Sequence, residues 1–253
     1  MVIALPLPRE ISLRARMRIA ARLAAMIGLF AVCVPFYYLY RVLGIDNPWP
    51  RVFLGGIASI AGVDIAVSGP KPTRPVFLIA NHVSWIDITV LARVTGTAFI
   101  GHDGLAAMPL LKELCRMNRT VFIARHDRAS VGDQVEQVRS ALTQTRALTI
   151  FPEGTTSDGT GLLPFKSSLL SAFEPLPEGI DVQPVLLDYG AEAAAIAWIG
   201  EEHGLHNFLR ILARKRRLRV AVRFLPPLTG ADVQGRKAIA AAAREAMSGA
   251  FHH

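Results

Sequence analysis

Cysteine is almost absent from this sequence, which contains only Cys33 and Cys115. Two widely separated cysteines cannot build the disulfide framework of a small secreted domain, so we expect free thiols in a reducing compartment. Charge is also scarce: 19% of the residues are charged, against about a quarter in an average soluble domain. Because 51% of the residues are hydrophobic, the chain has too much apolar surface to remain disordered.

Several common catalytic signatures are missing as well. The chain has no G-x-S-x-G nucleophile elbow and no G-x-x-x-x-G-K-[ST] phosphate loop. It has no cluster of cysteine and histidine at metal-ligand spacing, so we expect no metal. Basic residues are not interleaved with aromatic ones as they are on nucleic-acid platforms, so we expect no nucleic-acid partner.

The charge that is present is mostly positive, with 28 Lys and Arg against 20 Asp and Glu and a formal net charge of +8. A basic protein of this kind is attracted to phosphate on a nucleic acid, a membrane or a substrate. The high apolar content favours the membrane among these three.

Residues 1–60 are expected to form a basic N-terminus and membrane-associated helices. The uncharged run Leu23–Tyr40 is close to the length that a spanning helix requires, and Pro35 is expected to kink it. A cleaved signal peptide, a single spanning helix and a buried helix of a soluble protein are competing interpretations. We favour a kinked pair of helices, completed by the apolar stretch at 52–63, that enters one leaflet, because arginines flank the long run on both sides.

Residues 61–253 are expected to form one catalytic domain in which strands alternate with helices. Apolar runs of strand length lie at 63–69, 76–81, 97–101, 120–125, 147–154, 182–190 and 217–228. Helical segments are expected at 85–94, 108–118, 131–145 and 231–247. This alternation predicts an α/β fold with a mostly parallel central sheet flanked by helices, preceded by the N-terminal membrane-associated helical anchor. Functional loops of such sheets lie at the carboxyl ends of the strands.

His82 follows one expected strand, and Asp87 lies near the start of the next helix. An imidazole is a suitable general base near neutral pH, and a carboxylate on its other ring nitrogen would fix the tautomer. Because the chain lacks a nucleophile elbow, we expect His82 to activate a hydroxyl of the substrate. Taken alone, such a pair more often consists of an ordinary loop histidine and a helix-start carboxylate.

A second polar segment, residues 151–166, follows another apolar strand. Glu153 offers a carboxylate for a substrate hydroxyl, and Gly154 permits close approach of the backbone to a ligand. Thr155 adds a hydroxyl and Lys166 a cation. Alone, the segment is also compatible with a solvated loop.

Two basic features complete the candidates. Arg125 ends the strand expected at 120–125, where a guanidinium at the rim of a sheet suits bidentate capture of phosphate. The basic stretch at 209–219 is either a docking face for an acidic carrier protein or an anionic lipid, or a solvated helix end.

Together these segments resemble the glycerolipid acyltransferase family, which includes 1-acylglycerol-3-phosphate acyltransferases. The matching blocks are N-H-x-x-x-x-D at 81–87, F-I-x-R at 122–125, F-P-E-G-T at 151–155 and a proline-centred strand at 182–185. The resemblance covers roughly residues 60 to 230, and the first and third blocks in this order are highly specific.

The resemblance implies a membrane-associated O-acyltransferase that needs no cofactor. His82 would be the base and Asp87 the residue that orients it, while Arg125 and the Glu153–Gly154 segment would hold the acyl acceptor. The acyl group would come from acyl-CoA or acyl-carrier protein. The acceptor would be a lysolipid, with 1-acylglycerol-3-phosphate, which yields phosphatidate, placed first. The enzyme would act at the cytoplasmic face of the inner (plasma) membrane.

Two departures from the family pattern affect the acceptor. Arg119 stands where the second block often opens with glycine, and Thr156 stands where the third block often continues with arginine. The loss of that arginine removes one phosphate ligand and leaves lyso-ornithine lipid as an alternative acceptor. A non-catalytic module that binds anionic lipids is the alternative from a different class of protein, but it leaves His82 and Asp87 without a role.

Overall fold

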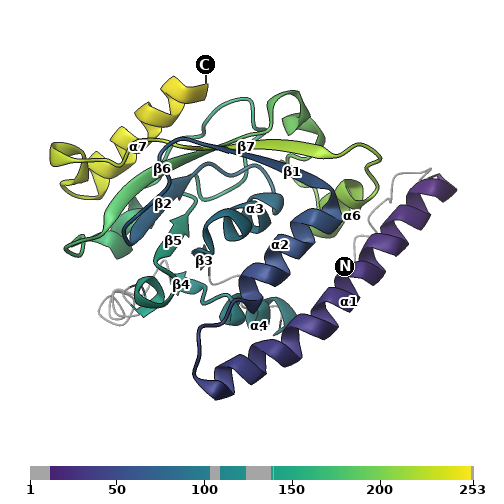
Figure 1. The fold of residues 1–253 in the computed structure, drawn as a ribbon. Coiled ribbons are helices and arrows are strands. Elements are labelled where there is room, and N and C mark those ends of the chain that lie inside the picture. The colour runs from purple at the N-terminus through teal and green to yellow at the C-terminus, as the bar shows by residue number, and fades with distance from the viewer. Residues whose placement is uncertain (1–11, 103–108, 124–137, 139, 252–253) are drawn as a thin grey trace, which may run out of the picture.

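The computed structural model describes residues 12–102, 109–123, 138 and 140–251. Its centre is a seven-stranded sheet in the order β1-β7-β6-β2-β5-β3-β4 (Figure 1). All neighbouring strands pair in parallel except β6 and β7. The predicted mostly parallel sheet is therefore confirmed. The strands are β1 (Val63–Ser68), β2 (Val76–Ala80), β3 (Ala98–His102), β4 (Val121–Ile123), β5 (Ala147–Ile150), β6 (Asp181–Asp188) and β7 (Leu218–Phe224).

Helices cover both faces of the sheet, because the central strands are apolar on both sides. Successive side chains of β2 point to opposite faces: Leu78 joins the core beneath α2 and α3, whereas Phe77 and Ile79 join the core beneath α7. The helices are α1 (Leu13–Leu43), α2 (Trp49–Ala61), α3 (Ile86–Thr95), α4 (Pro109–Met117), α6 (Gly204–Leu212) and α7 (Arg236–Phe251), with shorter 3₁₀ helices η3 (Ser167–Phe173), η4 (Gly190–Ala195) and η5 (Gly230–Val233).

The first two helices form a pair against the body of the protein. α1 continues through Pro35 as one helix of 31 residues. Among the described residues it is the one helix long and apolar enough to cross a membrane. Only 11% of its most apolar window is buried, so the interpretation as a buried core helix does not apply. α2 packs against both α1 and α3.

Several element boundaries differ from the sequence expectation. The strand expected at 147–154 ends at Ile150, because the chain turns at Pro152. The strand expected at 217–228 ends at Phe224, ahead of two prolines that cannot donate to a ladder. The helix expected at 231–247 begins at Arg236, after η5. Most of the helix expected at 131–145 lies outside the described residues.

Candidate active site

Three neighbouring strands in the middle of the sheet, β6, β2 and β5, run parallel and end at the same edge. His82 follows β2, Glu153 follows β5 and Tyr189 follows β6. Because the carboxyl ends of parallel strands meet there, polar groups from three separate stretches of sequence come into contact: Glu153 binds the His82 backbone, and Tyr189 binds Asp87. Figure 1 shows β6, β2 and β5 side by side in the sheet.

The first element of the site is a histidine–aspartate pair. His82 Nδ1 lies 2.8 Å from Asp87 Oδ2, and the Asp87 side chain is fully buried whereas that of His82 is 19% exposed. The same oxygen accepts the backbone N–H groups of Val83 at 2.6 Å and Ser84 at 2.9 Å. Asp87 lies in the first turn of α3, where backbone N–H groups favour negative charge. An ionised Asp87 makes Nδ1 the donor and leaves Nε2 as the free base.

Packing then fixes the orientation of the imidazole. The ring of His82 stacks on Phe151, with centroids 4.1 Å apart and an interplanar angle of 17°. Within the described part of the chain, no hydrogen bond to Nε2 is recorded. The arrangement can therefore accept a proton at Nε2 while Asp87 stabilises the resulting imidazolium.

Glu153 lies directly behind this pair. It is 1% exposed, and its Oε1 accepts the backbone N–H of His82 at 3.2 Å while Oε2 accepts that of Leu163 at 3.3 Å. Burial raises the pKa of Glu153 to about 7, although the two N–H groups act in the opposite direction. In this structure Glu153 therefore connects the His82 loop to the 151–166 segment through both of its oxygens.

Two further side chains hold the backbone around His82. Ser157 donates its N–H, at 2.7 Å, and its hydroxyl, at 3.1 Å, to the carbonyl of His82. Asn81 exchanges two hydrogen bonds with the backbone of Leu187 in β6, at 3.0 and 2.8 Å. Sequence analysis placed Asn81 in a motif but did not anticipate that it joins two strand ends.

Sequence analysis missed Tyr189. Its hydroxyl donates to Asp87 Oδ1 at 2.5 Å, and it is 4% exposed. Burial, and then the nearby charge of Asp87, raise the pKa of Tyr189 well above its ordinary value. The signal that could have found it is its position at the end of an apolar strand, the same rule that located His82.

The other predicted site residues have different outcomes. The Lys166 ammonium lies over Gly154: a Cβ added to that glycine would meet Nζ at 3.1 Å. Thr155 is exposed beside it, whereas the Thr156 hydroxyl donates to the carbonyl of Trp198. Arg125 lies outside the described residues.

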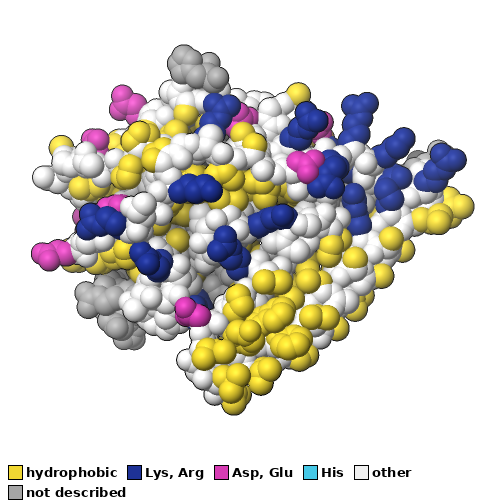
Figure 2. All heavy atoms as spheres, in the orientation of Figure 1, with side chains coloured by type: hydrophobic (Ala, Val, Ile, Leu, Met, Phe, Trp, Pro, Cys, Tyr) yellow, Lys and Arg dark blue, Asp and Glu magenta, His cyan; other side chains and the backbone are white. Residues whose placement is uncertain are grey.

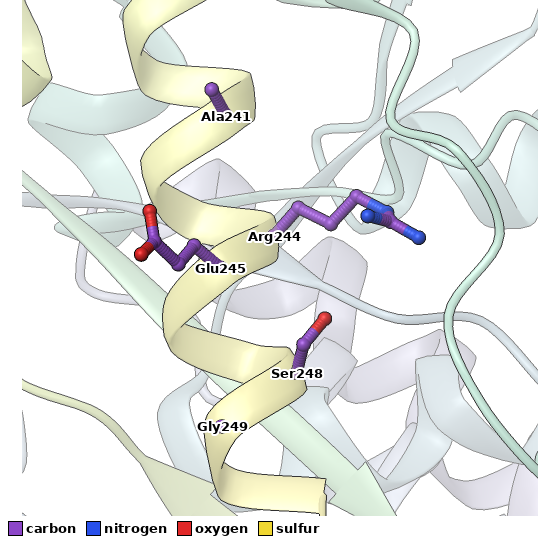
Figure 3. Close-up of a pocket in the computed structure, with 5 residues that line it drawn as sticks. All are labelled: Ala241, Arg244, Glu245, Ser248 and Gly249. Atoms are coloured by element: carbon purple, nitrogen blue, oxygen red, sulfur yellow. The ribbon is translucent and has the colours of Figure 1, made fainter.

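A hollow of about 600 Å³ lies on the surface of α7, and His82 and Asp87 are not among its lining residues. Figure 3 shows Arg244 extending from α7 toward a neighbouring loop. Its guanidinium contacts the carbonyls of Leu163 at 3.4 Å and Leu162 at 3.5 Å. The N–H of Leu163 in turn donates to Glu153. Arg244, which lines the hollow, is therefore connected to Glu153 through one residue, Leu163.

The fold and the site define an α/β protein in which the buried carboxylate of Glu153 supports the backbone of a histidine–aspartate pair. The model of the acyltransferase family matches residues 64–188. The lyso-ornithine lipid O-acyltransferase of Brucella abortus is 31% identical over 88% of this chain and 90% of its own length, and three further relatives share its description. The 1-acyl-sn-glycerol-3-phosphate acyltransferase of Neisseria gonorrhoeae is 31% identical over 78% of this chain and 80% of its own length.

A solved structure has the same fold. The 1-acyl-sn-glycerophosphate acyltransferase of Thermotoga maritima matches with a TM-score of 0.61 and 21% identity, over 93% of this chain and 96% of that one. The chain belongs to the acyltransferase family whose members acylate lysolipids, and it is an acyltransferase. The family and the enzyme class inferred from the sequence are confirmed.

Proposed function

We propose that His82 is the general base of an O-acyl transfer from a thioester to the hydroxyl of a lysolipid. The acceptor oxygen attacks the thioester carbonyl carbon as its proton passes to His82 Nε2. The carbon–sulfur bond then breaks, and the leaving thiolate takes the proton from the imidazolium. The observation that carries this proposal is the buried Asp87 carboxylate, 2.8 Å from Nδ1, which stabilises the imidazolium between the two steps.

Lyso-ornithine lipid is the acceptor that we place first, ahead of 1-acylglycerol-3-phosphate. Thr156 occupies the position at which the family often carries arginine, and its hydroxyl is already bound to the Trp198 carbonyl. This position therefore supplies no cation for a phosphate. The four relatives described as lyso-ornithine lipid O-acyltransferases support the same acceptor.

1-Acylglycerol-3-phosphate is the second candidate. The exposed Lys166 ammonium near Gly154 supports it, because it offers one cation beside the His82 loop. The Neisseria gonorrhoeae relative carries that activity in its description.

An acceptor comparison tests this order. We expect the purified protein in detergent to favour lyso-ornithine lipid by about tenfold or more in kcat/KM. Thr156→Arg should raise turnover of 1-acylglycerol-3-phosphate, whereas Thr160→Arg, which adds the same charge to an exposed position of the same loop, should not. A wild-type preference for 1-acylglycerol-3-phosphate would make it the first candidate acceptor, and the proposed acyl-transfer reaction would still hold.

We also propose that α1 lies along one leaflet with both of its ends on the same side. Arg18 donates to the carbonyl of Ala213 at 3.0 and 3.1 Å, and Arg22 donates to that of Leu212 at 2.8 Å. Near the other end, Tyr38 donates to Glu113 of α4 at 3.0 Å. These contacts keep α1 against the body, which supports the one-leaflet anchor over a spanning helix.

The outer side of α1 has the surface that such an anchor needs. Figure 2 shows hydrophobic side chains gathered over the C-terminal half of α1 and the start of α2, and Lys and Arg side chains around the N-terminal half of α1. An apolar stripe beside basic groups suits the boundary between acyl chains and phosphates. The exposed apolar residues of the helix include Ile27, Val32, Phe36, Leu39 and Val42.

The acyl donor is proposed to be acyl-CoA or acyl-carrier protein, delivered at the cytoplasmic face. Both donors are anionic, and the exposed Lys215 and Arg216 of the loop after α6, with the exposed Arg219 at the start of β7, support attraction of either one. Parallel assays with the two donors distinguish them, and charge reversal of these three residues should raise KM for the donor that uses this loop.

A further inference from the structure

The two oxygens of Asp87 have different environments. Oδ2 faces three N–H groups, those of the Val83 and Ser84 backbone and of His82 Nδ1. Oδ1 has one recorded partner among the described residues, the hydroxyl of Tyr189 at 2.5 Å. One tyrosine therefore satisfies the side of the carboxylate that does not face the base.

We propose that Tyr189 is a positioning residue that holds Asp87 Oδ1 and thereby sets the orientation and the proton affinity of His82. By donating to Oδ1, the phenol fixes the plane of the carboxylate so that Oδ2 points at Nδ1. It also withdraws charge from the carboxylate, so the imidazolium that forms at His82 is less strongly stabilised than it would be beside a carboxylate without that hydrogen bond. The inference rests on the proposed role of His82 and holds for any lysolipid acceptor.

The fold gives Tyr189 little freedom to do anything else. It follows β6 directly, and η4 begins at the next residue. Its ring lies in the core beneath α2 and α3. The two Asn81–Leu187 hydrogen bonds lock the end of β6 to the end of β2, so the hydroxyl is placed relative to Asp87 by the sheet itself.

The other charged groups near the pair are few among the described residues. Glu153 faces Asp87 from the loop after β5, and Arg244 acts on Glu153 from α7. Neither donates a hydrogen bond to Asp87 Oδ1. The raised pKa of Tyr189 keeps its phenol protonated throughout the range in which a histidine base works.

Tyr189→Phe tests the inference, because it removes one hydroxyl and leaves the ring in place. We expect kcat to fall about tenfold as Asp87 loses a hydrogen bond to a charged group, while KM for the acceptor stays unchanged. The acid limb of the kcat profile should move to higher pH by about half a unit. The downfield proton resonance of the His82 Nδ1–H bond should also shift, which reports the change without turnover.

Two controls separate the possible failures. Thr97→Val removes another buried hydroxyl, which bonds to the Ala98 carbonyl at 2.7 Å and to Thr149 at 2.9 Å; it should lower stability and leave the pH profile unmoved. If Tyr189→Phe behaves like Thr97→Val, the tyrosine is only structural and the inference is overturned. If His82→Ala keeps full activity, the proposed role of His82 fails instead. The two failures are distinguishable because each is read from a different variant.

Discussion

At the scale of single residues, the carboxyl group of Glu153 is buried, so its ionisation lowers the stability of the folded protein. Burial raises its folded-state pKa from 4.5 to about 7, so between these pH values the folded chain keeps a proton that the unfolded chain releases. Stability is then full below the unfolded pKa and falls as pH rises, by about 3 kcal/mol in total for this pKa difference.

Glu153→Gln removes this titration. We expect the free energy of unfolding of the wild type to fall relative to that of Glu153→Gln as pH rises from 4.5 to about 7, measured by chemical denaturation in detergent at several pH values. Glu201→Gln, at an exposed position, is the matched control and should show no such trend. If the free energies of unfolding of wild type and Glu153→Gln changed in parallel with pH, the raised pKa of Glu153 would be contradicted.

The residues of the site differ in how readily the sequence reveals them. His82 and Asp87 were predicted because a motif of fixed spacing puts both on one loop and helix start. Tyr189 was not, because it reaches the site from another strand end and its partner is fixed only when β6, β2 and β5 align. For Glu153 the sequence indicated the location, while only the structure gives its two backbone partners.

At the scale of elements, the contact between α1 and α2 depends on a glycine. A Cβ at Gly56 would lie 2.5 Å from Leu29 Cδ2, whereas nothing lies within 4 Å of a Cβ at Gly28. Gly56→Leu should therefore separate the helices and cost about 1–3 kcal/mol. Gly28→Leu should cost nothing, because leucine is a better helix former than glycine.

Thermal unfolding of both variants in detergent checks this prediction. For a chain of this size, the loss at Gly56→Leu corresponds to a fall in Tm of about 2–4 °C per kcal/mol. Equal Tm values for Gly56→Leu and Gly28→Leu would mean that α1 does not pack on α2 as described.

The elements themselves were largely predictable, because buried strands appear as apolar runs of strand length and amphipathic helices appear through their periodicity. The differences between prediction and structure lie at the ends of elements, as in the strand expected at 147–154, which ends at Ile150. α1 continues through Pro35 as one helix of 31 residues, and the kink expected at that proline stays a prediction. The strand expected at 182–190 corresponds to β6, Asp181–Asp188. Its antiparallel pairing with β7 could not be predicted, because a local sequence pattern does not report which strands become neighbours or in which direction they run.

At the scale of the whole molecule, the position of α1 against the body makes a prediction about topology. In a background without native cysteines, Arg14→Cys and Glu201→Cys place one label at the start of α1 and one on the catalytic body, both exposed. We expect a water-soluble maleimide to label both from the same side of oriented vesicles. Labelling from opposite sides would show that α1 spans the membrane.

The central claim is that His82, held by Asp87, is the base of acyl transfer to a lysolipid. The most direct measurement is the rate of acyl transfer by wild type, His82→Ala and His203→Ala in one detergent preparation. The loss of a general base should slow His82→Ala by about a hundredfold to ten-thousandfold, while His203→Ala, at an exposed histidine that caps α6, should stay close to wild type. Retention of most of the activity in folded His82→Ala would contradict the account.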